Sequence, residues 1–162
     1  MFLFGNLSQT EMLNMIRLVD AGYGYGAGKY IFRNLNWDIN EGQVWAILGP
    51  NGSGKSTLLN CLGGVIDLKE GKIELGGMVG MVPQNFNSNL EITVLEMVVL
   101  GRARFLPWWA VPDEWDYELA VRALRKVGGE SLAEKKISQI SGGELQLVII
   151  ARALVSEPKV LV

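Results

Sequence analysis

The sequence contains no histidine, which excludes histidine-based nucleophilic catalysis and most zinc sites from these 162 residues. Its one cysteine, Cys61, cannot form an internal disulfide, as is typical of a protein from a reducing compartment. No apolar run approaches the roughly 20 residues that a membrane-spanning helix needs. The net charge of −2 argues against nucleic-acid binding through a general basic surface. We therefore expect no nucleic-acid partner, and contact with a membrane only through another subunit.

The composition, 49% hydrophobic and 20% charged, is that of a globular domain with its own core. Residues 1–14 show neither helical nor strand spacing, and they lack the basic residues that open a signal peptide. We therefore expect a loosely attached N-terminal leader without regular structure. The continuous apolar run at 44–48 predicts a strand buried on both faces, as in parallel sheets. The remaining patterns predict strands at 16–19, 30–39, 71–82 and from 159, and helices at 58–62, from 93, at 117–127 and at 141–154.

Residues 49–56 match the phosphate-loop pattern G-x-x-x-x-G-K-S between a predicted strand and a predicted helix. Glycines let successive amides curl around an anion, and the following helix adds its N-terminal dipole. Lys55 can reach the β- and γ-phosphates, Ser56 can bind Mg²⁺, and Thr57 can contact a further phosphate oxygen. A chance match is expected ~0.01 times in such a sequence, so phosphate binding is favoured over a simple turn. The predicted binding residues are Gly49, Asn51, Gly52, Ser53, Gly54, Lys55, Ser56 and Thr57.

A second glycine motif, Gly22-x-Gly24-x-x-Ala27, superficially fits a dinucleotide-binding fingerprint. The residues that follow alternate like a strand, however, and no helix N-terminus would be available for a pyrophosphate. We interpret this segment as a turn.

Residues 140–146, Ile-Ser-Gly-Gly-Glu-Leu-Gln, open the last predicted helix. Ser141 and Glu144 form a capping box, so a well-capped helix is the plain interpretation. Capping does not require Gly142 and Gly143, which weaken the first helical turn. Their presence favours a second anion site, in which the Ser141 hydroxyl and the glycine amides face a phosphate.

Residues 140–146 resemble the LSGGQ signature of ATP-binding-cassette (ABC) ATPases. With the phosphate loop at 49–56, this signature makes the chain resemble that family over residues 15–162. This resemblance implies an α/β fold: a P-loop NTPase (RecA-like) core, an N-terminal antiparallel β part and an inserted α-helical subdomain, incomplete at the C-terminus. The implied boundaries are a leader at 1–14, the β part and first core segment at 15–84, the helical subdomain at 85–137, and the signature helix with the start of the Walker B strand at 138–162.

The resemblance also implies site residues and cofactors. Tyr25 resembles the aromatic residue that stacks on adenine; Tyr23 is the alternative, and an exposed turn tyrosine is the plain interpretation. Gln84 resembles the glutamine that senses the γ-phosphate and Mg²⁺, so Lys55 and Gln84 are the implied catalytic residues. ATP would lie between the phosphate loop of one subunit and Ser141, Gly142 and Gly143 of a second subunit packed head to tail.

Val160-Leu161-Val162 ends before the Asp-Glu pair of the family's Walker B motif, and the family's switch histidine is absent. We therefore expect a truncated chain that binds ATP weakly and hardly hydrolyses it. The alternatives to a transporter subunit are a soluble ABC ATPase without a membrane subunit and a nucleotide-binding module without turnover.

Residues 93–102 resemble the helical segment of ATPases that import metal chelates: iron–siderophore, haem, cobalamin or molybdate-like cargo. This resemblance implies permease subunits, indirectly a substrate-binding protein, and a peripheral cytoplasmic position on the inner face of the cell membrane. Trp108, Trp109 and Trp115 fall in the helical part, where the family docks on its membrane subunits. We expect local packing of these tryptophans, with docking as the alternative.

Overall fold

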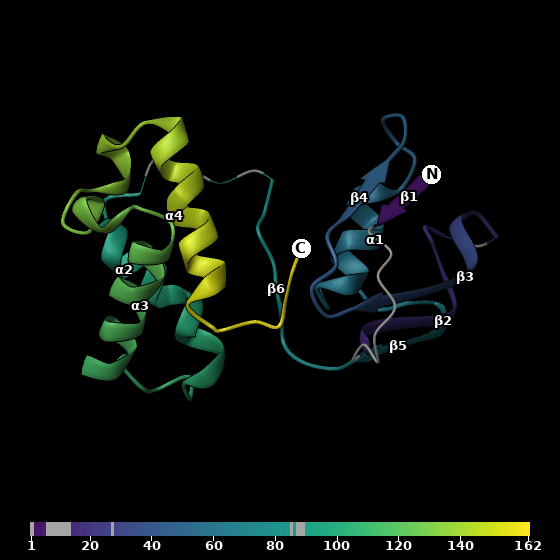
Figure 1. The fold of residues 1–162 in the computed structure, drawn as a ribbon, viewed down its shortest axis with the longest axis horizontal. Coiled ribbons are helices and arrows are strands. Elements are labelled where there is room, and N and C mark those ends of the chain that lie inside the picture. Colours follow the sequence, from purple (N-terminus) through teal and green to yellow (C-terminus); the bar gives the residue numbers. More distant parts are fainter. Residues whose placement is uncertain (1, 6–13, 27, 85, 87–89) are drawn as a thin grey trace. The chain divides into compact units, whose positions relative to one another are not determined.

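The computed structural model describes residues 2–5, 14–26, 28–84, 86 and 90–162. The chain divides into two compact units, one comprising residues 1–79 with Val162, the other residues 80–161 (Figure 1). The first unit holds most of the strands and the helix α1, and the second holds the helices α2, α3 and α4.

The first unit is built on an antiparallel sheet in the order β3-β2-β5. Its strands are β2 (Asn14–Gly24), β3 (Tyr30–Asn40) and β5 (Glu70–Leu75). The sequence predicts only residues 16–19 as the first of these strands, but β2 continues through Gly24 because β3 and β5 both pair along it. The predicted N-terminal antiparallel part is present. The second glycine motif is followed by strand β3 and not by a helix; its Ala27 lies outside the described residues.

The phosphate-loop strand β4 (Trp45–Leu48) pairs with β1 (Phe2–Gly5) in antiparallel register. The prediction that residues 1–14 contain no regular element is therefore wrong for residues 2–5, because the edge of β4 offers backbone groups with which an extended segment can pair. Residues 1 and 6–13 lie outside the described part. The prediction that β4 is buried on both faces is also wrong for this chain. Leu48 is 53% exposed, and within the described residues β1 is the only strand bonded to β4.

The second unit packs three helices around a buried apolar cluster that includes Val98, Leu124 and Val148. They are α2 (Val94–Val99), α3 (Glu114–Lys126) and α4 (Gly142–Leu154), joined by the 3₁₀ segments η1 (Leu100–Phe105), η2 (Glu130–Leu132) and η3 (Ile137–Gln139). The short strands β6 (Val79–Gly80) and β7 (Val160–Leu161) pair with each other.

Capping boxes start all three of these helices. Thr93 and Glu96 cap α2, and Ser141 and Glu144 cap α4, as the sequence predicts. The helix α3 begins at Glu114, three residues earlier than predicted, because Asp113 and the side chain of Asp116 form a third box. No helix in the described part of the chain combines the length and apolarity that crossing a membrane requires.

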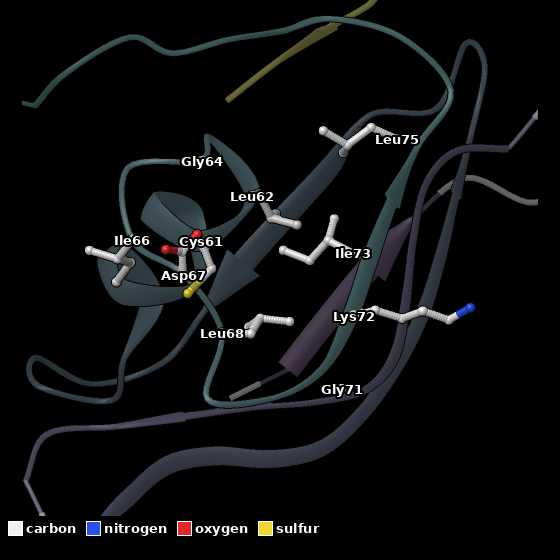
Figure 2. A pocket seen from close by; sticks show the side chains of 10 residues that line it. All are labelled: Cys61, Leu62, Gly64, Ile66, Asp67, Leu68, Gly71, Lys72, Ile73 and Leu75. Atoms are coloured by element: carbon white, nitrogen blue, oxygen red, sulfur yellow. The ribbon is translucent and has the colours of Figure 1, made fainter.

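A pocket of about 340 Å³ lies beside the C-terminal end of α1 (Lys55–Leu62), away from the phosphate loop. In Figure 2 the side chains of Leu62, Leu68 and Ile73 point toward one another, whereas Lys72 points away. Burial, and secondarily the charge of Asp67, raise the pKa of the nearby Cys61 thiol. The thiol therefore stays protonated at neutral pH and is not an activated nucleophile.

Candidate functional site

The phosphate loop leads from β4 into α1 through two glycines in the left-handed region. Gly52 has φ 79°, and Gly54, the N-cap of α1, has φ 91°. No side chain caps this helix, and Leu58 N–H donates to Gly54 O at 2.9 Å. The N–H groups of residues 55–57 precede that bond and lie at the positive end of the helix dipole. This arrangement suits an anion.

Gly54 is also required by packing. A Cβ built there would lie 2.1 Å from Cγ2 of Ile31 on β3, whereas one built at Gly52 would meet nothing within 4 Å. The antiparallel sheet thus approaches the start of α1 so closely that only glycine fits. Sequence analysis did not identify Ile31, because no local pattern reports a neighbour that lies 23 positions away.

Two side chains of the loop carry hydrogen-bond donors suited to a phosphate. Lys55 Nζ donates to the carbonyl oxygens of Gly49 at 2.8 Å and Pro50 at 2.9 Å, which leaves one of its three donors for another acceptor. Ser53 Oγ is buried and has no hydrogen-bond partner among the described residues. A buried hydroxyl without a partner is unfavourable, and a phosphate oxygen would satisfy it. The loop therefore fits the triphosphate that the motif predicts.

Tyr25 directly follows β2 and is 63% exposed; its ring lies edge to face with that of Tyr23, and the ring centroids are 5.4 Å apart. The more exposed Tyr25 is the better candidate for stacking on a base. Lys69, absent from the predicted set, donates from Nζ to Gly26 O at 3.0 Å and lies 6.0 Å from the Tyr23 ring. It supports the turn from 43 positions further along the chain, a separation at which no sequence pattern would have identified it.

The second predicted anion site opens α4. Ser141 Oγ accepts from Glu144 N–H at 3.3 Å, and Ser141 N–H donates to the Glu144 carboxylate at 2.8 Å. The hydrogen bond from Ser141 N–H to the carboxylate is the main cause that lowers the pKa of Glu144. A Cβ added to Gly142 or Gly143 would meet nothing within 4 Å, and neither glycine has a positive φ. Nothing in their surroundings within the described chain requires glycine at these positions.

Gln84 is exposed, in the segment between β6 and α2. The predicted site residues are thus divided between the units: Tyr25 and residues 49–57 belong to the first, and Gln84 with Ser141–Gly143 to the second.

The family model for ABC transporters matches residues 32–162. The chain belongs to the ABC transporter ATP-binding family. It is 39% identical to the molybdate import ATP-binding protein MolC of Haemophilus influenzae, across 93% of this chain and 59% of the relative. It is 37% identical to the spermidine/putrescine import ATP-binding protein PotA of Haemophilus ducreyi, across 96% of this chain and 43% of that protein.

Solved structures agree. A metal-chelate type ABC transporter in an inward-facing conformation matches with a TM-score of 0.80 and 38% identity, over 91% of this chain and 58% of that one. A dimeric ATP-binding cassette in a post-hydrolysis state, bound to ADP and Pi, matches with a TM-score of 0.71 and 31% identity, over 91% and 72%. The predicted α/β fold of a P-loop NTPase cassette is confirmed. This chain spans 59% of the length of the molybdate import protein and 58% of the solved chain of the metal-chelate type transporter.

Proposed function

We propose that this chain is the ATP-binding part of an ABC importer subunit, and that it holds Mg²⁺–ATP through two separate sets of backbone amides. The observation that carries the proposal is the pair of glycines in the first turn of α4, directly after its N-cap Ser141. Gly142 and Gly143 leave the helix start open, although neither backbone angles nor packing within the described chain demand glycine. A ligand that approaches from outside explains their presence, because a side chain there would obstruct it.

The phosphate loop supplies the first set of amides. In the proposed complex, Lys55 turns its remaining donor toward the β- and γ-phosphates, and Ser53 Oγ gains an acceptor. Ser56 and Gln84 would hold Mg²⁺ together with phosphate oxygens, because this ion commonly combines few protein ligands with substrate phosphates. No cluster of three or more His, Cys, Asp or Glu that could hold a metal occurs in the described ranges. Tyr25 stacks on the adenine, and such stacking accepts any base.

Ser141, Gly142 and Gly143 supply the second set, which we assign to the ATP held by a second copy packed head to tail. The triphosphate then joins two protein surfaces, and its hydrolysis by the whole protein would release them. A dimeric solved relative with bound ADP and Pi supports this assembly. The assembly would act on permease subunits at the inner face of the cell membrane. A substrate-binding protein would deliver the cargo to those permease subunits and so would be an indirect partner.

For the cargo we propose a metal chelate or a molybdate-like oxyanion. The metal-chelate type transporter and the molybdate import protein support this choice. The likeness to a polyamine import protein shows that similar cassettes serve different cargoes. Uptake of candidate cargoes by the whole transporter, reconstituted in vesicles, tests this choice. Uptake of polyamines but not of molybdate or iron chelates would contradict it.

The nucleotide sites are tested by calorimetric titration of this chain with Mg²⁺–ATP. Lys55→Ala should weaken binding by about tenfold or more, because it removes a charged donor. Lys126→Ala, which removes an exposed lysine from the last turn of α3, is the matched control and should bind as the parent does. Equal affinities for Lys55→Ala and the control would refute the first site.

Gly143→Leu separates the second site from the first. Its binding of ATP by a single copy should be unchanged, because α4 contributes to the other copy's nucleotide. The ATP-dependent association of two copies, measured by sedimentation velocity, should be lost. Association that Gly143→Leu leaves intact would refute the role of α4.

A further inference from the structure

The connection between η1 and α3 carries a group of exposed apolar side chains that the nucleotide sites do not explain. Trp108 is 92% exposed, Trp109 70% and Val111 82%. The prediction that the tryptophans pack locally is therefore wrong for Trp108 and Trp109, because the fold leaves most of both side chains exposed to solvent. We call residues 105–112 the aromatic loop.

The tip of the aromatic loop is a tight turn. Ala110 N–H donates to Pro107 O at 2.9 Å, which places Trp108 and Trp109 at the two central positions. Their rings lie at 89° to each other with centroids 5.6 Å apart. The two indoles are thus presented at the tip of a turn, and their exposure shows that the described chain does not enclose them in a groove.

The base of the loop is fixed by a largely buried ion pair. Arg102 Nε lies 2.8 Å from Asp116 Oδ1, with side-chain exposures of 16% and 4%, and the Arg102 guanidinium lies 4.2 Å from the Phe105 ring. Prolines at 107 and 112 further restrict the backbone. The aromatic side chains are therefore presented by a pre-organised segment, so ordering it on binding costs little entropy.

The charges around the loop largely cancel. No charged residue occurs between Phe105 and Pro112, Asp116 pairs with Arg102, and Glu118 pairs with Arg122. Arg104, Asp113 and Glu114 are exposed, and together they leave one net negative charge beside the loop. The surface around the aromatic loop is therefore nearly neutral, which suits a zwitterionic lipid interface better than a strongly charged partner. Exposed apolar patches mark interaction sites, and tryptophan, with an apolar body and one N–H donor, is enriched at the boundary between lipid headgroups and acyl chains.

We propose that the aromatic loop inserts Trp108, Trp109 and Val111 into the headgroup region of a lipid bilayer. The contact is additional to any permease contact and does not depend on the nucleotide sites. Because burial of apolar side chains would favour this contact, its strength should not depend on salt concentration, unlike binding through basic residues.

The test is co-sedimentation of this chain with protein-free phosphatidylcholine vesicles at ~50 mM and ~500 mM NaCl. The parent chain should bind equally at both salt concentrations. Trp108→Ser with Trp109→Ser should lower the partition coefficient by about tenfold or more. Trp108→Phe with Trp109→Phe should retain most of the binding, and Val65→Ser, at a site 62% exposed in the first unit, should retain all of it. Shallow brominated lipids should quench the fluorescence of the parent chain but not that of the Ser variant.

ATP titration and thermal unfolding of each variant, expected to be unchanged, separate loss of the loop contact from loss of the nucleotide site or the fold. Absence of vesicle binding by the parent chain, or equal binding by the Ser variant, would overturn the proposal. Binding that appears only when a membrane subunit is present in the vesicles would assign the loop to a protein partner and would equally overturn it.

Discussion

Four glycines of the two predicted phosphate sites are present for three different reasons. Gly52 needs a left-handed backbone, Gly54 needs that backbone and also space for Ile31, and Gly142 and Gly143 need neither. The first two are explained by the fold, and the last two remain to be explained by a ligand or a partner.

A matched pair of substitutions tests the distinction between Gly52 and Gly54. Gly52→Ala should lower the free energy of unfolding by about 1–2 kcal/mol, the cost of a left-handed Cβ. Gly54→Ala should cost more, because its Cβ would also lie within 2.1 Å of Ile31. Combining Ile31→Ala with Gly54→Ala should recover part of the stability that Gly54→Ala loses. Combining it with Gly52→Ala should recover none, as measured by urea unfolding. Equal losses for the two single variants would show that the approach of β3 is unimportant.

At the scale of elements, the entry to α3 depends on Asp116, which accepts from Asp113 N–H and from Arg102. The hydrogen bond from Arg102 is the main cause that lowers the pKa of Asp116, against the opposing effect of burial. The folded-state pKa therefore lies below the unfolded value of about 3.9. The resulting stability is complete above that value and is lost as the pH falls through the folded-state pKa.

Asp116→Asn should accordingly destabilise the chain at neutral pH by about 2–4 kcal/mol, because Arg102 keeps a largely buried charge without its partner. The variant should also lose less stability than the parent chain as the pH falls below about 4. Glu118→Gln breaks an exposed pair with Arg122 and should change stability by less than about 1 kcal/mol. Urea unfolding followed by circular dichroism between neutral pH and pH ~3 measures both effects; parallel pH profiles for Asp116→Asn and the parent chain would exclude this role of Asp116.

At the scale of the whole molecule, the two units have separate groups of fully buried side chains. The first includes Ile16, Leu18 and Leu58, and the second includes Val98, Leu124 and Val148. Units with their own cores open as separate cooperative blocks.

Leu124→Ala should therefore cost about 2–5 kcal/mol of stability and increase amide exchange in α2, α3 and α4, while β2 and β3 keep their protection. Leu58→Ala, equally buried in the first unit, is the reciprocal control and should increase exchange in β2 and β3. Hydrogen exchange followed by mass spectrometry measures the change in amide protection in both variants. Uniform loss of protection across the chain in either variant would mean that the units unfold together.

Across these scales, local features were predictable and long-range ones were not. The capping boxes at Thr93 and Ser141 involve residues three positions apart, so the sequence alone indicates them. The box at Asp113 was equally readable, but a later start was predicted for α3. The position of β1 beside β4 was not predictable, because pairing between distant strands depends on which edge is available and not on any local pattern.

The sequence by itself determined the two glycine-rich helix starts and the family to which they belong, because anion binding by backbone amides is encoded in a few consecutive residues. Only the tertiary structure decided that Ile31 closes on Gly54, that Lys69 supports the turn of Tyr25, and that Trp108 and Trp109 face solvent. Each of these depends on contacts between residues far apart in the chain, or on their absence, and burial is a property of the packed molecule and not of the local sequence.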